Sequence, residues 1–254
     1  MSRNYDLIQQ ARAESEIAPI PELKTTFSVD DVNGNGRGNA ADLDLDQMAQ
    51  EESLKLVQRV FLLQAEECPH AVVFAGIELG DGCSRICANT AKTLARNISG
   101  SVCLVDANLR SPSLAQFFGI SNHHGLSDAL RQRGAIRDFT QQLRPDNLWL
   151  LSCGYFATDS QSLLSSERLK EPLAQLRKEF DFVLINVSAA ILDGAASLWG
   201  PLVDGVILVV EANLTRREVA RKAKERLESA NVRLLGAVLN NRTFPIPETI
   251  YRNI

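Results

Sequence analysis

The chain has 254 residues, of which 45% are hydrophobic, so it is long enough for one domain with a sizeable core. Its net charge of −4 gives no reason to expect a nucleic-acid-binding protein. No apolar run approaches membrane-spanning length, and the first residues contain no signal-peptide core, so we expect no direct membrane insertion. Five cysteines, three of them in predicted core elements, favour a reduced, cytoplasmic protein.

The N-terminal part of the sequence predicts a disordered tail, residues 1–46, ahead of one folded domain, residues 47–254. The stretch VNGNGRGNAAD in this tail has too little apolar surface to offset the loss of chain entropy. Its glycines mimic a dinucleotide-binding fingerprint, but no strand precedes them, so we interpret them as a linker. A helix is then predicted from about Asp46 to Glu66, with apolar positions at Met48, Leu54, Val57, Phe61 and Leu62.

The next stretch, Ala71–Asn89, indicates a buried strand, a glycine-bearing loop and the start of a helix. Ser84 opens the helix, whose inward face carries Ile86, Cys87, Ala91, Leu94 and Ala95. This layout is typical of a phosphate-binding loop, in which backbone amides and a helix N-terminus face an anion. The candidate phosphate- or nucleotide-binding residues are Gly80, Asp81, Gly82, Cys83, Ser84, Arg85 and, after the last predicted strand, Asn240.

Two positions of this loop depart from the usual pattern, which ends in Gly-Lys-Ser or Gly-Lys-Thr. A neutral thiol, Cys83, occupies the cationic position, and Ile77 stands where the first glycine would be. A thiol at a helix N-terminus can have a lowered pKa, which leaves open a reactive Cys83, although loss of an unneeded lysine is the simpler interpretation. Cys83 and Cys87 lie four residues apart on one helix face, but the sequence offers no further ligands for a metal there.

A second buried strand, Val102–Val105, ends directly before Asp106. A carboxylate at the carboxyl end of a strand, beside a phosphate loop, is where such folds place magnesium chemistry. The alternative is an aspartate that only caps the following turn, and both interpretations stay open. If magnesium binds, its ligands would be Ser84 and Asp106.

The remaining elements alternate between strand and helix. This pattern predicts an α/β fold with a doubly wound, mostly parallel sheet and helices on both faces, and ligands at the carboxyl ends of the strands. The adjacent His123 and His124 lack the partners that a metal site needs. The predicted elements are helices at 112–118, 125–130, 166–179 and 215–229, and strands at 148–151, 182–185, 205–210 and 234–239.

Several stretches together resemble the bacterial tyrosine kinases of capsule and exopolysaccharide synthesis. These kinases are deviant P-loop ATPases, a group that also includes the chromosome-partitioning ATPases. The most specific stretch is DANLRSPSL, because the plain partitioning ATPases lack its Arg-x-Pro. The other matching stretches are GDGCS, GLSDAL, LLSSERL, FDFVLINVSAAILDGAA, VDGVILVVEANLT and LLGAVLNN.

The resemblance implies functional positions, and this chain departs from several of them. Of the catalytic positions, Asp106 is retained, the loop lysine is Cys83, and the Walker B aspartate is Asn186. The family's N-terminal packing motif, which would form an interface between subunits, is reduced to Glu52, Lys55 and Gln58. The family's tyrosine-rich C-terminus is absent here. We expect a short helix at 247–253 that carries Tyr251, and we expect no autophosphorylation of this tyrosine.

The leading hypothesis is therefore a catalytically degenerate kinase-like protein that acts as a regulatory or docking subunit in exopolysaccharide biosynthesis or export. ATP and Mg²⁺ would bind weakly or not at all. By resemblance, its partner would be a membrane chain-length or co-polymerase protein that recruits it to the inner face of the membrane, and it could form a homo-oligomer. The alternatives are an active ATP-dependent tyrosine kinase or ATPase of the same pathway, and a partitioning-type positioning ATPase.

Overall fold

The computed structural model describes residues 22–23, 40–62, 68–132, 134–155, 165–187 and 194–242, with side chains from residue 49 onward. The predicted glycine-rich linker up to residue 39 and the predicted C-terminal helix lie outside these residues. No helix in the described part of the chain is both long and apolar enough to cross a membrane.

The described residues contain one eight-stranded sheet with the order β1-β8-β7-β2-β6-β3-β5-β4. Every neighbouring pair is parallel except β4–β5, which is antiparallel. The predicted α/β fold with a mostly parallel sheet is thus confirmed. The strands are β1 (Glu22–Leu23), β2 (Ala71–Gly76), β3 (Val102–Asp106), β4 (Gln141–Gln142), β5 (Leu148–Leu151), β6 (Phe182–Val187), β7 (Gly205–Glu211) and β8 (Leu234–Asn240).

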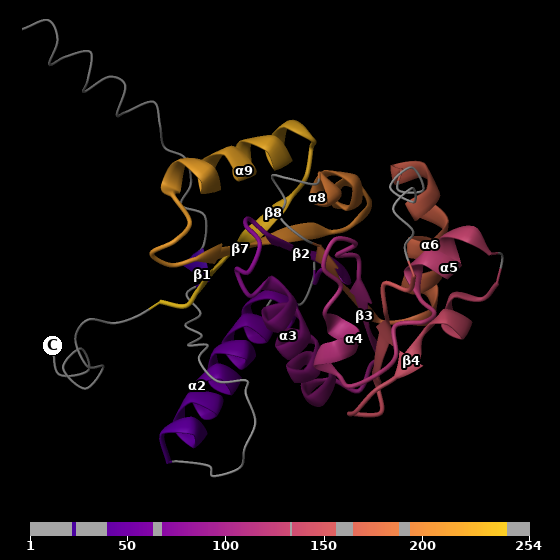
Figure 1. The fold of residues 1–254 in the computed structure, drawn as a ribbon, viewed down its shortest axis with the longest axis horizontal. Coiled ribbons are helices and arrows are strands. Elements are labelled where there is room, and N and C mark those ends of the chain that lie inside the picture. The colour runs from indigo at the N-terminus through magenta and orange to yellow at the C-terminus, as the bar shows by residue number, and fades with distance from the viewer. Residues whose placement is uncertain are drawn as a thin grey trace, which may run out of the picture.

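Helices cover both faces of the sheet (Figure 1). The central strands β2 and β3 are buried along their whole length, which explains why their sequences are continuous apolar runs rather than alternating ones. One face is covered by α5 (Leu126–Arg131), α6 (Ser166–Glu179), α8 (Ala195–Trp199) and α9 (Arg217–Ser229), with the short helices η2 (Ile136–Phe139) and η4 (Gly200–Leu202).

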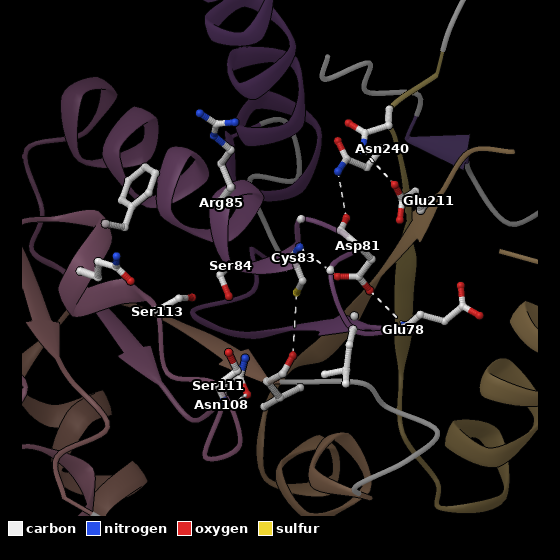
Figure 2. Close-up of a pocket in the computed structure, with 18 residues that line it drawn as sticks. Glu78, Asp81, Cys83, Ser84, Arg85, Asn108, Ser111, Ser113, Glu211 and Asn240 are labelled. Atoms are coloured by element: carbon white, nitrogen blue, oxygen red, sulfur yellow. Dashed lines mark hydrogen bonds between the residues drawn. The ribbon is translucent and has the colours of Figure 1, made fainter. Parts of the chain in front are cut away.

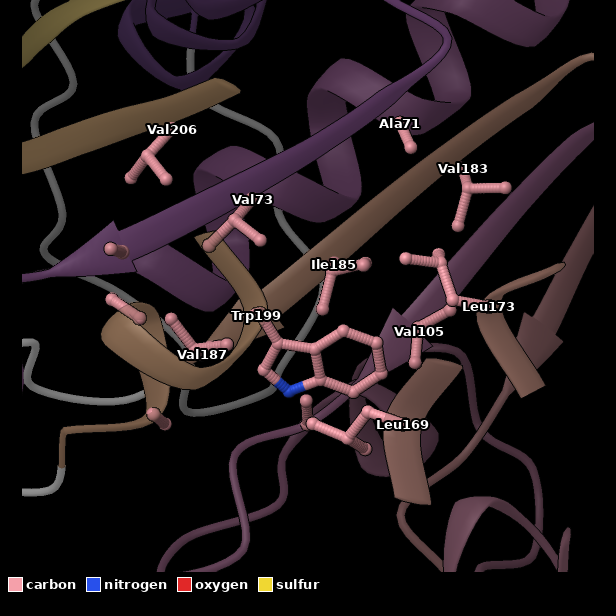
Figure 3. Close-up of a cluster of buried hydrophobic side chains, with 14 of the residues drawn as sticks. Ala71, Val73, Val105, Leu169, Leu173, Val183, Ile185, Val187, Trp199 and Val206 are labelled. Atoms are coloured by element: carbon pink, nitrogen blue, oxygen red, sulfur yellow. The ribbon is translucent and has the colours of Figure 1, made fainter. Parts of the chain in front are cut away.

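The core on this face is centred on Trp199, which is only 1% exposed. Its indole lies among aliphatic side chains of the sheet and of α6, including Ile185 and Leu169 (Figure 3). The predicted inward face of α6 is confirmed, and the helix begins after Ser165, whose hydroxyl accepts the Arg168 N–H at 3.4 Å. Burial of these apolar surfaces fixes α6 and α8 against the strands that lead into the site.

The opposite face is covered by α2 (Ala40–Val57), its π-helical continuation η1 (Gln58–Leu62), α3 (Cys83–Asn97) and the short α4 (Leu114–Phe117). The predicted inward face of α3 is confirmed, because all five of its residues are buried. These helices and the strands beneath them form a second apolar cluster. The two clusters sandwich the sheet and leave its carboxyl edge for polar residues.

The structure differs from the sequence-based expectations in the N-terminal part of the chain and near α8. The helix predicted from Asp46 begins at Ala40, and Leu23 with its neighbour forms a strand paired with β8. Of the predicted apolar positions, Leu54 is half-buried and Leu62 is exposed. The π-helical turn at 58–62 shifts the periodicity there, so that Val60 is buried with Phe61 and Leu62 is not. The short helix α8 was not predicted.

Candidate functional site

A cavity of about 1010 Å³ opens where β2, β3, β6, β7 and β8 end (Figure 2). This is the carboxyl edge of the sheet, where parallel α/β folds bind ligands. Among the described residues that line it, the charged side chains are three carboxylates, Glu78, Asp81 and Glu211, and the guanidinium of Arg85. The other lining residues are Gly76, Leu79, Gly80, Gly82, Cys83, Ser84, Asn108, Ser111, Ser113, Gln116, Phe117, Val187, Asn240 and Asn241.

The predicted phosphate loop joins β2 to α3 along one wall of this cavity. Gly80 and Gly82 have φ angles of +88° and +78°, which side-chain-bearing residues seldom adopt, so the glycines let the backbone turn here. Between them, Asp81 is only 3% exposed. Its carboxylate accepts the Cys83 N–H at 3.0 Å and the Glu78 N–H at 3.2 Å. The loop therefore has the predicted shape, with a carboxylate folded into it.

The surroundings of Asp81 disfavour its charged form. The pKa of this carboxyl is raised to about 6, mainly by burial and to a smaller extent by the nearby Glu211. The amides of Cys83 and Glu78 act in the opposite direction, because they donate to the carboxylate. Asn240 holds the same residue from outside by donating its Nδ2 to the Asp81 carbonyl at 2.8 Å. Asn240, a predicted nucleotide-binding residue, thus lines the cavity, but its side-chain amide donates a hydrogen bond to the loop.

Cys83 does not take the place of the missing lysine. Its side chain is 5% exposed, and its Sγ lies 3.9 Å from the Val187 carbonyl oxygen, toward the interior (Figure 2). Burial raises the pKa of this thiol well above its usual range, and Asp81 and Cys87 add to the effect. This is the opposite of the lowered pKa that a helix N-terminus alone would produce, so the alternative of a reactive thiolate is wrong.

Asn186, Ser84 and Asp106 meet behind the loop. The parallel register of β3 and β6 places Asp106 beside Asn186. The Asn186 Nδ2 donates to the Ser84 Oγ at 3.0 Å and to the Asp106 Oδ1 at 3.2 Å. The Asp106 carboxylate, which only accepts when ionised, requires the nitrogen on this side of the amide. The Asn186 Oδ1 is buried and has no hydrogen-bond partner in the described structure. One amide thus joins the three residues that the sequence assigned to metal and catalytic positions.

Asp106 is also the organiser of the loop that follows β3. It is 1% exposed and accepts the backbone N–H groups of Asn108, Ser113 and Leu114 at 3.2, 3.1 and 3.0 Å. Burial raises its pKa, whereas these donors and Asn186 act to lower it. The capping role, one of the two interpretations drawn from the sequence, is therefore present in the structure.

The structure brings most of the predicted site residues to one place, but not all. Ser84 and Arg85 line the cavity, whereas Glu52 and Lys55 lie on α2 and pair with each other at 2.6 Å. Eleven lining residues were not among the predicted site residues. Asn108 and Glu211 could have been found, because each lies at or just after the end of a strand. The others are Gly76, Glu78, Leu79, Ser111, Ser113, Gln116, Phe117, Val187 and Asn241.

All five cysteines are free thiols, and four of them are buried, while Cys68 is half-buried. The Cys68 Sγ lies 2.8 Å from the Phe61 carbonyl oxygen. Burial raises the pKa of each thiol, to about 12 for Cys153. Within the described residues, no three histidine, cysteine or carboxylate side chains are grouped to hold a metal ion.

Comparison with known proteins relates this chain to bacterial tyrosine kinases. No protein-family model matches the chain. It is 31% identical over 163 residues to the tyrosine-protein kinase YwqD of Bacillus subtilis, and this alignment covers 64% of this chain and 68% of YwqD. It is 28% identical over 163 residues to the succinoglycan biosynthesis transport protein ExoP of Rhizobium meliloti, covering 63% of this chain and 21% of ExoP. The solved VpsO kinase domain superimposes with a TM-score of 0.69 at 26% identity, over 78% of this chain and 98% of that domain.

Proposed function

The chain belongs to the family of bacterial tyrosine-protein kinases, and we propose that it is a catalytically degenerate member of it. In this proposal it acts as a regulatory or docking subunit in exopolysaccharide biosynthesis or export. The proposal is supported by what the chain's own residues do at the positions where a kinase of this family would hold metal and phosphate.

The observation that carries the proposal is the position of the Asn186 amide. A magnesium ion at this edge would need the Ser84 hydroxyl and the Asp106 carboxylate as oxygen ligands. Here both oxygens accept hydrogen bonds from the Asn186 Nδ2, at 3.0 and 3.2 Å. The N–H₂ group carries partial positive charge toward the place that a cation would take, and it supplies no ligand oxygen there. These residues therefore do not fit magnesium.

The second observation is the missing cation of the loop. Phosphoryl transfer depends on positive charge held close to the β- and γ-phosphates. Cys83 is neutral and turned inward, and among the described lining residues the carboxylates outnumber the guanidinium groups. Loss of one well-placed electrostatic group costs about two to three orders of magnitude in rate. With both groups replaced, we expect weak binding of ATP and little turnover.

The proposed partner is a membrane chain-length or co-polymerase protein that recruits this chain to the inner face of the membrane. Two observations support it: the described residues contain no membrane-spanning helix, and the matched region of ExoP is about a fifth of a protein named for succinoglycan transport. Self-association through α2, where Glu52 and Lys55 lie, is part of the same proposal.

Magnesium alone tests the proposed role of Asn186. In Asn186→Asp a second carboxylate would stand against Asp106, so this variant should be less stable than the wild type in EDTA. It should regain stability when MgCl₂ is added, because a bound cation stabilises the folded state by mass action. The wild type should not respond to Mg²⁺. Asn231→Asp, a substitution of the same kind at an exposed position just after α9, is the control and should not respond either.

Nucleotide binding then separates this proposal from an active kinase. Calorimetric titration with Mg-ATP should give weak binding by the wild type and at least tenfold tighter binding by Cys83→Lys with Asn186→Asp, since two charged groups return. Cys83→Lys alone should improve binding more than turnover. Tight binding by the wild type, or phosphate on Tyr251 without any added kinase, would contradict the proposal and establish the active-kinase alternative.

A further inference from the structure

The backbone amides of the phosphate loop already have an anionic partner. In an open loop of this shape, the N–H groups at the start of the helix point to the ligand's phosphate. Here the Cys83 N–H donates to the Asp81 Oδ1 at 3.0 Å, and the Glu78 N–H donates to the Oδ2 of the same carboxylate at 3.2 Å (Figure 2). Each carboxylate oxygen thus takes one loop amide.

Two other residues fit the loop around this carboxylate. A Cβ atom added at Gly76 would lie 2.4 to 2.9 Å from the carboxyl atoms of Asp81, so the glycine leaves the room that this side chain fills. From the other side, the Asn240 Nδ2 donates to the Asp81 carbonyl at 2.8 Å. A Cβ atom at Gly82 would come within 2.3 Å of that nitrogen. The position of Asp81 is therefore fixed by contacts from β2 and from the end of β8.

We propose that Asp81 is the resident anion of this loop and that it determines the specificity of the cavity, excluding phosphate and leaving the site to ligands without phosphate groups. This inference rests on the proposed function in one respect, namely that the cavity corresponds to the nucleotide site of the family. An incoming phosphate must displace the carboxylate from two amides and also meet the negative charge of Glu78 and Glu211.

Occupation of the amides is a different effect from negative charge near the cavity, and the chain allows the two to be separated. Asp81→Ala removes the charge and frees the amides. Gly76→Ala keeps the charge and displaces the carboxylate, since only the end of a side chain must move to admit the new methyl group. Glu211→Gln removes a charge from the same cavity and leaves the amides occupied, because Glu211 pairs with Asn241 and not with the loop.

The probe is inorganic pyrophosphate, titrated calorimetrically into the full chain without magnesium. Asp81→Ala should bind it at least about tenfold more tightly than the wild type, since it gains charge-assisted amide contacts and loses a repulsion. Gly76→Ala should also bind more tightly, and Glu211→Gln should change the affinity by less than about threefold. Equal gains in Asp81→Ala and Glu211→Gln, with none in Gly76→Ala, would mean that charge alone matters and would overturn the proposal. No gain in either loop variant would overturn it as well.

Amide hydrogen exchange provides a measurement that needs no ligand. The Cys83 and Glu78 amides should exchange faster in Asp81→Ala and in Gly76→Ala than in the wild type, and unchanged rates in both would contradict the proposal. Should Asp81→Ala fail to fold, Gly76→Ala decides both tests. Failure here leaves the proposed function standing, because the pyrophosphate comparison depends on neither magnesium nor Asn186. Tight Mg-ATP binding by the wild type would overturn both proposals, whereas unchanged pyrophosphate binding by the loop variants would overturn only the role of Asp81.

Discussion

The same strands build two regions of opposite character. Along β3 and β6, inward-facing residues such as Val105 and Ile185 belong to the apolar core around Trp199, and the strand ends place Asp106 and Asn186 at the carboxyl edge of the sheet. In the core, the packed side chains are almost all apolar. At the carboxyl edge, the Asn186 Oδ1 and the Asn240 Oδ1 are buried without a hydrogen-bond partner in the described structure.

This difference indicates that the stability of the fold comes mainly from the apolar core and not from the site. The core follows the pattern of the family's fold, whereas Cys83 and Asn186 are neutral residues at positions where the family resemblance implies charged groups. Under the proposed function, replacement of a catalytic charge leaves the packing unchanged, so the fold can persist when the chemistry weakens. Two carboxylates near the site have structural roles: Asp106 accepts backbone N–H groups of the loop after β3, and Asp81 accepts backbone N–H groups of the loop after β2.

The largest expected effect comes from opening the core. Trp199→Ala should lower the free energy of unfolding by about 4 kcal/mol, because it removes a large, fully buried side chain and leaves a cavity. Urea denaturation measures this. Leu79→Ala, at a side chain that is 60% exposed beside the site, should change stability by less than about 0.5 kcal/mol. Similar losses in the two variants would contradict the contrast between the regions.

Replacement of Asp106 should cause the next largest loss in the free energy of unfolding, as if this residue belonged to the core. Asp106→Ala leaves three loop amides and the Asn186 Nδ2 without their acceptor and should cost about 3 kcal/mol. Hydrogen exchange should become faster across residues 108–114. Asp138→Ala, at an exposed position on η2, is the control. A variant with unchanged stability would mean that Asp106 is not a structural residue.

A smaller effect depends on pH. Burial raises the pKa of Asp81 from 3.8 to about 6, so the folded chain binds more protons than the unfolded chain between these values. The stabilising contribution of this group is fully present below pH 3.8 and is lost as the pH rises through 6. Relative to Asp81→Asn, the free energy of unfolding of the wild type should therefore increase by about 2 kcal/mol when the pH is lowered from 8 to 4.5. Urea denaturation at both pH values tests this, and a difference that does not change with pH would contradict the assignment.

The smallest effect is expected at the amino edge of the sheet, away from the cavity. Arg177 makes a two-pronged ion pair with Asp204, at 2.7 and 3.2 Å, and Asp204 also accepts the N–H groups that begin β2. Because both side chains are about one-third exposed, Arg177→Met should cost about 1 kcal/mol or less. Arg144→Met, in a pair whose members are 92% and 78% exposed, should cost nothing measurable. Equal effects would show that geometry and burial do not distinguish the two pairs.

The sequence predicted six of the eight described strands, all except β1 and β4, together with the face of α3 and the clustering of polar residues at one edge, because these follow from local periodicity and from parallel topology. It did not predict the π-helical turn or the pairing of β1, since both depend on tertiary contacts. Nor did it predict the direction of individual side chains. Cys83 turns inward with Cys87, four residues along the same face, and Asn240 reaches Asp81 across 159 residues of sequence.

The thiols have a practical consequence for spectroscopy. Since four of the five cysteines are buried and all five have raised pKa values, thiol-directed reagents should react first with the half-buried Cys68. This residue lies three positions before β2, the strand that leads into the phosphate loop. The natural chain thus offers one attachment point for a fluorophore or spin label, and distances from that point could follow assembly or partner binding without an engineered cysteine.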